Sequence, residues 1–87
     1  MNKIVDLLVI EELCLNNNFM FDGEFPYAVL FMEDGGLEFC WTDETGEEQR
    51  IHIVEVSNNG ATFKCTDIDG DSHNLVFLRR FNPLEDE

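Results

Sequence analysis

Turn residues at short, regular intervals are the feature that most constrains the fold of this chain. From residue 25 onward, short apolar segments alternate with clusters of Gly, Asn and Asp. These residue types adopt positive-φ turn conformations at little cost, and such spacing is typical of antiparallel hairpins. The pattern predicts a five-stranded antiparallel meander over about residues 25–81, with strands at 25–33, 37–42, 48–56, 61–68 and 73–81.

The segment before the meander predicts a helix at about residues 2–17. Asn2 is a candidate N-cap, and the asparagines at 16–18 suit a helix terminus. The apolar side chains fall nearly all round the helical wheel, so we expect this helix to be buried on more than one side. A two-sided buried strand at 3–11 is an open alternative, because periodicity does not separate the two structures.

Side-chain alternation indicates which faces of the strands are buried. One face of the sheet is expected to gather Leu37, Phe39, Trp41, Ile51, Ile53 and Phe63, whereas Glu38 and Cys40 point the other way. The first and last strands are apolar on both faces. We therefore expect a strongly bent sheet whose first and last strands meet, with the helix on their outer side; a homodimer interface would explain the same pattern. The predicted fold class is α+β, an N-terminal helix packed on a bent five-stranded meander approaching a small barrel.

The 87 residues fit a single domain, 1–87, with an acidic tail at 82–87 that we expect to be mobile. The order of one helix and five strands is similar to that of Sm-like RNA-binding proteins, but their glycine and aspartate pattern and basic RNA face are missing. We therefore assign no family. The three cysteines are odd in number and form no C-x-x-C pair, so we expect a disulfide-free fold in a reducing cytoplasm. We also expect no signal peptide and no membrane-spanning helix.

Residues able to carry catalysis are few and stand in no recognisable motif. The only histidines are His52 and His73, and the only serines are Ser57 and Ser72. We expect both histidines at the surface and the cysteines as structural residues, with a Cys40–His52 pair left open. The sequence therefore predicts a protein that is not an enzyme and that holds no cofactor.

Negative charge is the most informative functional feature. Nineteen acidic residues against five basic ones give a net charge of −14, which repels nucleic acid and anionic membranes. Alternate turns of a meander lie at the same end of the sheet, so we expect carboxylates of two loops to converge on one rim. The predicted rim consists of Asp43, Glu44, Glu47, Glu48, Asp67, Asp69 and Asp71, with Asp22 and Glu24 at the start of the first strand.

This rim predicts a non-enzymatic interaction protein that docks on a basic surface of a partner protein, including an inhibitor that imitates nucleic-acid charge. A divalent-cation site at Asp67, Asp69 and Asp71 is one alternative, although Ser72 stands where an EF-hand loop requires Gly. A homodimer without a charge-based function is another. In the simplest alternative, acidic residues accumulate in turns and have no binding role.

Overall fold

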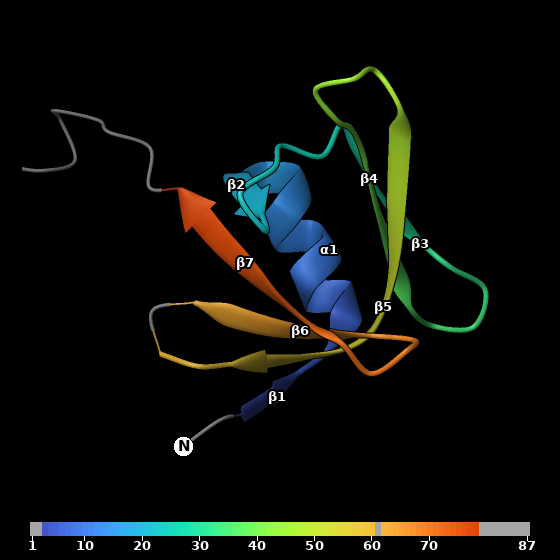
Figure 1. Ribbon diagram of the computed structural model, residues 1–87. Coiled ribbons are helices and arrows are strands. Elements are labelled where there is room, and N and C mark those ends of the chain that lie inside the picture. Colours follow the sequence, from blue (N-terminus) through green and yellow to red (C-terminus); the bar gives the residue numbers. More distant parts are fainter. Residues whose placement is uncertain (1–2, 61, 79–87) are drawn as a thin grey trace, which may run out of the picture.

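The computed structural model describes residues 3–60 and 62–78, which form one helix and seven strands (Figure 1). In chain order the elements are β1 (Lys3–Val5), α1 (Leu7–Asn16), β2 (Asn18–Phe21), β3 (Ala28–Phe31), β4 (Leu37–Thr42), β5 (Glu48–Asn58), β6 (Phe63–Asp67) and β7 (Ser72–Leu78). All pairings are antiparallel, and the strand order is β2-β7-β6-β5-β4-β3, with β1 paired to the end of β5.

β5 is the strand around which the sheet bends. Its first part pairs with β4, and its last part pairs with β6 and β1. The register with β6 shifts between Ile53 and Glu55, and a bulge of this kind bends a strand and increases its twist. Figure 1 shows the β4–β5 and β6–β7 hairpins diverging as two arms. The result is a half-barrel whose edge strands are β2 and β3.

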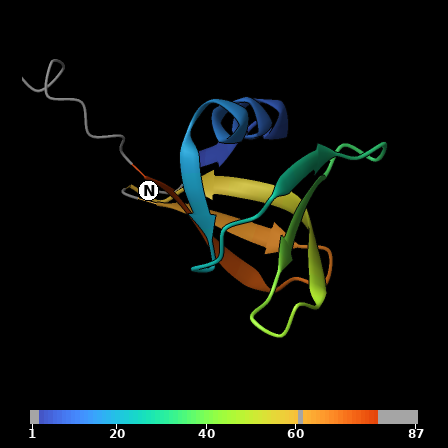
Figure 2. The same cartoon turned by 90° about the horizontal axis from the view of Figure 1, so that it is seen from above.

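The helix packs on the concave side of this half-barrel. It begins after Asp6, whose Oδ1 accepts a hydrogen bond of 2.9 Å from the backbone N–H of Leu8. Ile10 and Cys14 are four residues apart and therefore lie on one face of the helix, where both are buried. Figure 2 shows α1 lying over the opening between β2 and β3, and the helix contacts both strands.

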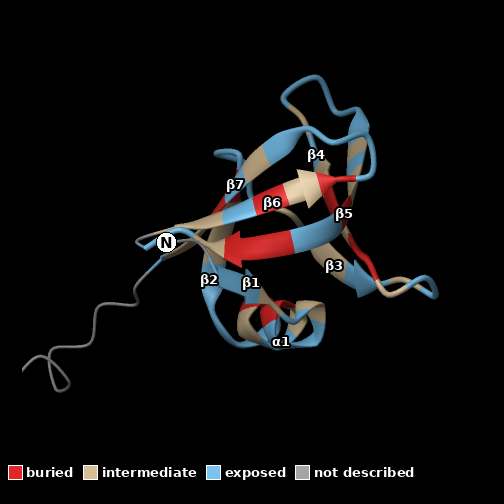
Figure 3. Cartoon of the chain, turned by 90° about the horizontal axis from the view of Figure 1, so that it is seen from below, coloured by how far each residue is buried: buried red, intermediate tan, exposed pale blue. Residues whose placement is uncertain are grey.

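One core joins the helix to every long strand. Its buried members are Ile10, Cys14, Phe21, Leu37, Phe39, Ile53, Val56, Cys65 and Leu75. Figure 3 shows buried segments on β5, on β6 and on the inner side of α1. The rings of Phe21 and Phe39 stack with their centres 4.4 Å apart and an interplanar angle of 9°, which ties edge strand β2 to β4 across the concave side.

Three features of the predicted fold are confirmed. α1 ends at Asn16, β4 has the predicted bounds, and the sheet is antiparallel and strongly curled. The predicted core face is confirmed, since Leu37, Phe39 and Ile53 are buried and Trp41, Ile51 and Phe63 are partly buried against them. Cys40, expected on the opposite face, is buried as well.

The N-terminal prediction was wrong in its extent and in its burial. The helix buries one face, at Ile10 and Cys14, and leaves Leu8, Val9 and Leu15 exposed. The helix starts at Leu7 and not near Asn2, because Asp6 caps it and Lys3–Val5 leaves it as β1 to pair with β5. The alternative of a strand at 3–11 holds only for those first three residues.

The predicted count of five strands was also wrong, because β1 and β2 were missed. β2 pairs with β7 and occupies the position that we assigned to the first strand of the meander. The first strand of the predicted meander is β3, which forms the opposite edge of the sheet. The first and last predicted strands therefore do not meet. The helix packs on the concave side of the sheet and not on the outer side of these two strands. The predicted strands at 25–33 and 61–68 shorten to Ala28–Phe31 and Phe63–Asp67, whereas 48–56 lengthens to Glu48–Asn58. Ala61 of the fourth predicted strand, residues 79–81 of the last strand and the tail at 82–87 lie outside the described residues.

With ten residues, α1 is too short to cross a lipid bilayer, and the described part of the chain holds no other helix.

Candidate functional site

The structure divides the predicted acidic rim into two groups. Thr42 pairs with Glu48 at the tip of the β4–β5 hairpin, whereas Asp67, at the β6–β7 turn, pairs with Ile53. Five residues of β5 separate these two points, which at about 3.3 Å each corresponds to roughly 16 Å along the strand. We call Asp43, Glu44, Glu47 and Glu48 the loop acids and Asp67, Asp69 and Asp71 the turn acids.

Asp43 organises its own loop. Its Oδ1 accepts hydrogen bonds from the hydroxyl of Thr45 at 2.6 Å, the N–H of Thr45 at 2.9 Å and the N–H of Glu47 at 3.0 Å. Its Oδ2 accepts a bond of 2.9 Å from the Gln49 amide. These bonds, that of the Thr45 hydroxyl above all, lower the pKa of Asp43. Because the carboxylate is engaged inside the loop, Asp43 shapes this end of the hairpin.

The other loop acids differ in how far they are neutralised. Glu48 Oε2 accepts a hydrogen bond from the Tyr27 hydroxyl and lies 3.5 Å from Arg50 Nη2. Glu44 and Glu47 are exposed, and their side chains form no hydrogen bond or ion pair with any described residue. The uncompensated negative charge of this loop therefore lies at Glu44 and Glu47.

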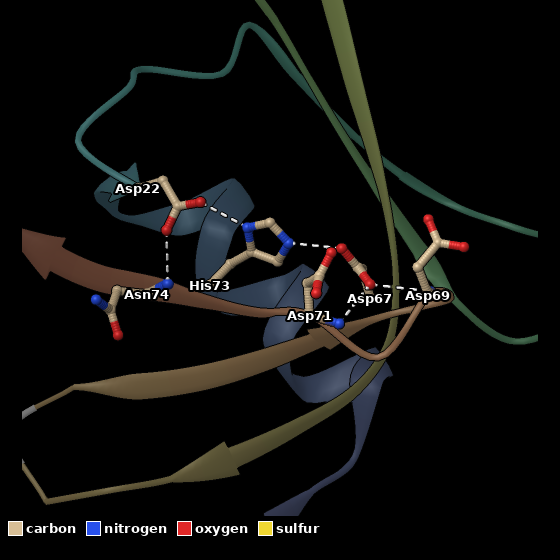
Figure 4. Close-up of polar contacts among 6 residues, drawn as sticks. All are labelled: Asp22, Asp67, Asp69, Asp71, His73 and Asn74. Atoms are coloured by element: carbon tan, nitrogen blue, oxygen red, sulfur yellow. Dashed lines mark hydrogen bonds and ion pairs between the residues drawn. The ribbon is translucent and has the colours of Figure 1, made fainter.

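Beside the β6–β7 turn, the partly buried His73 of β7 is held between two carboxylates (Figure 4). His73 Nε2 lies 2.7 Å from Asp67 Oδ2, and Nδ1 lies 2.5 Å from Asp22 Oδ2. The ring also stacks on Phe21, with centres 5.3 Å apart. Since both nitrogens face carboxylate oxygens, the doubly protonated imidazolium satisfies both contacts. Burial opposes this charge, but the hydrogen bonds to Asp67 and Asp22 outweigh it and raise the pKa of His73.

Both oxygens of each carboxylate in this cluster contact protein donors. Asp67 Oδ1 accepts backbone bonds of 2.9 Å from Asp69 and from Asp71, while Oδ2 faces His73. The bond with His73, followed by these backbone bonds, lowers the pKa of Asp67. Asp22 Oδ1 accepts a 2.8 Å bond from the N–H of Asn74. The cluster therefore fastens the β2–β3 loop to the β6–β7 turn.

The prediction that both histidines are surface residues was wrong, because only 13% of the His73 side chain and 20% of the His52 side chain are exposed. The position of His73 beside the acidic turn was the available signal for the contact with Asp67. The contact with Asp22 joins residues 51 positions apart, and no local sequence pattern predicts it. Asp22 does lie near the turn acid Asp67, as predicted. His73 stands between the two carboxylates, which therefore do not form an open rim.

Asp69 and Asp71 are the turn acids that remain free. Both are exposed, and their carboxylates form no hydrogen bond or ion pair with a described residue. They do not act with Asp67 as a cation site, because both oxygens of Asp67 are engaged. Within residues 3–60 and 62–78, no three His, Cys, Asp or Glu side chains are arranged to hold a metal ion. The geometry does not support the divalent-cation alternative.

The open question of a Cys40–His52 pair is answered by the strand register. On the β4–β5 ladder Cys40 lies opposite Arg50, and His52 lies opposite Glu38. Cys40 Sγ is 3.8 Å from Glu38 Oε1, and burial together with this carboxylate raises the pKa of the Cys40 thiol. His52 Nε2 lies 3.1 Å from Asp34 Oδ2, out of line for a hydrogen bond. The described contacts therefore contain no Cys–His pair.

All three cysteines are free, buried thiols. Burial is the main cause that raises the pKa of Cys14 and of Cys65 to about 12. Because the thiolate is the nucleophilic form, these surroundings favour structural over reactive cysteines.

A groove of about 1290 Å³ opens where the end of α1 approaches both edge strands. Its lining consists of Cys14, Leu15, Asn16, Asn17, Asn18, Phe19, Phe25, Pro26, Tyr27, Ala28, Val29, Phe77 and Leu78, none of which is charged. Leu15, Phe25 and Tyr27 remain 70%, 66% and 60% exposed. The sequence pattern predicted a first strand of the meander that is apolar on both faces, and part of that strand lines this groove. It did not predict the groove itself.

Comparison with known protein families, with curated proteins and with solved structures finds no match to this chain.

Proposed function

We propose that this protein is a non-enzymatic acidic binding protein that docks on a basic surface of a partner protein, where it takes the place of a nucleic acid. The observation that carries the proposal is a set of exposed carboxylates that form no ion pair with a described residue: Glu44, Glu47, Asp69 and Asp71. These four acids refine the predicted rim, because Asp43 and Asp67 use their oxygens within their own loops.

Clustered negative charge speeds the encounter with a basic patch, and salt screens it over a Debye length of about 8 Å at physiological ionic strength. The two groups of acids are separated by roughly 16 Å along β5, about two Debye lengths, so each acts on its own part of a partner surface. Arg50 lies beside Glu48 and His73 beside Asp67, but the side chains of Glu44, Glu47, Asp69 and Asp71 form no ion pair with a described residue, and within each group their charges repel one another. A binding role accounts for this unfavourable arrangement.

The surroundings of the nucleophilic groups support the non-enzymatic part of the proposal. The buried thiols have raised pKa values, and both nitrogens of His73 are occupied by carboxylates. A general base needs a free nitrogen within reach of a substrate proton, and His73 offers none.

The test compares two variants that each lose four negative charges. The rim variant carries Glu44→Gln, Glu47→Gln, Asp69→Asn and Asp71→Asn, and the control variant carries Glu11→Gln, Glu12→Gln, Glu33→Gln and Glu55→Gln. Basic partners are captured from an extract of the cells that encode the protein and identified by mass spectrometry. Displacement of fluorescent duplex DNA from the purified partner is then followed by anisotropy.

We expect wild type and control variant to displace the DNA at similar concentrations and the rim variant to associate about tenfold more slowly, because charge steering acts mainly on association. Equal losses in both variants would mean that net charge alone matters. No displacement by the wild-type protein would remove the nucleic-acid mimic from the proposal.

A further inference from the structure

We infer that the apolar groove binds an extended segment of the partner in which basic residues alternate with apolar ones. This inference deepens the proposed function and rests on it for the sign of the partner's charge. The groove supplies apolar contacts, while the neighbouring carboxylates select the basic residues.

The first support is the position of the two sheet edges. Asn18 and Phe19 of β2 and Ala28 and Val29 of β3 line the groove, and each strand has a partner on one side only among the described residues. An unpaired edge accepts an added strand through backbone hydrogen bonds, and alternate side chains of that strand point into the groove. An extended occupant therefore fits this geometry.

The second support is the set of exposed apolar side chains. Leu15, Phe25 and Tyr27 come from the helix end and the segment before β3, and each leaves more than half of its surface open. Aromatic residues in a groove are common anchors of binding energy. Burying them under apolar side chains of a partner removes this surface from water, which stabilises a complex by about 25 cal/mol per Å² before the costs of association.

The third support is charge. The lining is neutral, but the Tyr27 hydroxyl donates to Glu48, the loop acid at the start of β5, whose carboxylate also lies 3.5 Å from Arg50. Glu24 precedes the exposed Phe25 and is itself exposed. A second copy of this chain would bring another net charge of −14 to the same surface, and like charges at an interface oppose association. A basic segment places its cations beside these carboxylates.

The experiment uses three fluorescein-labelled synthetic peptides, each long enough to pair with a whole edge strand of four residues. One alternates Lys with Leu, one Lys with Ser, and one Glu with Leu. The groove variant carries Leu15→Ser and Phe25→Ser. The control variant carries Leu8→Ser and Ile68→Ser, two exposed apolar residues outside the groove lining. Affinity is measured by anisotropy, and the contact region by amide NMR shifts of the full chain.

We expect the Lys/Leu peptide to bind saturably, to shift the amides of Asn18, Phe19, Ala28 and Val29, and to bind the groove variant about tenfold more weakly. The control variant should retain the wild-type affinity. Equal binding of the Lys/Ser peptide, with shifts confined to the β4–β5 loop, would overturn the groove inference and leave the proposed function standing.

Two further results would overturn the inference in other ways. Tighter binding of the Glu/Leu peptide than of the Lys/Leu peptide would contradict a basic partner and with it the proposed function. Concentration-dependent shifts of the groove amides without peptide, together with a doubled mass in solution, would assign the groove to a second copy of the chain.

Discussion

Replacing Phe39 by Ala tests whether the half-barrel core has been identified correctly. Phe39 is fully buried, stacks on Phe21 at 4.4 Å and meets the edge of Phe19 at 6.1 Å. Truncating a buried Phe to Ala costs about 3 to 5 kcal/mol. A chain of 87 residues has a free energy of unfolding of about 4 to 13 kcal/mol at typical values per residue. The substitution therefore removes a large share of the stability.

The effect is measured by urea unfolding and by thermal melting, with Phe25→Ala as the matched control. Phe25 is 66% exposed, so the same truncation there should change the free energy of unfolding by less than about 0.5 kcal/mol. For a domain of this size, Phe39→Ala should lower the melting temperature by about 12 °C or more. If Phe39→Ala leaves the protein unfolded, the milder Phe39→Leu supplies a measurable loss of about 1 kcal/mol.

A double-mutant cycle of Phe39 with Phe21 isolates the contact between β2 and β4. We expect a coupling free energy of about 0.5 to 1.5 kcal/mol, the usual contribution of an aromatic pair beyond burial. Equal melting temperatures of Phe39→Ala and Phe25→Ala would refute the core. A coupling of zero with a large single effect would show that β2 does not close over β4.

Two other predictions concern titratable groups. His73 has a raised pKa in the folded state, so the stability that it contributes is full below its unfolded pKa of about 6.5 and is lost as pH rises through the folded value. The advantage in melting temperature of wild type over His73→Gln should therefore be larger at pH 6 than at pH 9; an advantage that grows with pH would contradict the imidazolium. Because burial holds the pKa of Cys14 and Cys65 at about 12, a thiol reagent at neutral pH should label them only in urea and a reductant should leave the melting curve unchanged. Rapid labelling of the native protein, or a large drop in melting temperature on reduction, would contradict buried free thiols.

The parts of the fold that could be predicted are those specified by local patterns. Alternation placed Leu37 and Phe39 in the core because a strand sends successive side chains to opposite faces, whatever its partners are. Gly35, Gly46 and Gly70 have positive φ angles in the hairpin connections, as the turn chemistry required. These features depend on neighbouring residues only.

The parts that could not be predicted depend on partners distant in sequence. Lys3–Val5 and Asn18–Phe21 contain too few residues for a periodicity, and they become strands because β5 and β7 offer free edges to them. The burial of His73 requires Asp22, and the side of the sheet on which α1 packs follows from the direction of curl. None of these long-range contacts follows from the local sequence of the segments involved.

The predicted single rim illustrates the same distinction for the candidate site. The prediction placed alternate turns at the same end of the sheet and assumed strands of equal length, so that the two loops would lie side by side. β5 runs from Glu48 to Asn58 and shifts register between Ile53 and Glu55, so its two halves serve different neighbours. The hairpin tip at Glu48 and the partner of Asp67 at Ile53 therefore lie five residues apart on β5, before its register shift. A partner that contacts both groups of acids must span this length of β5, roughly 16 Å of strand.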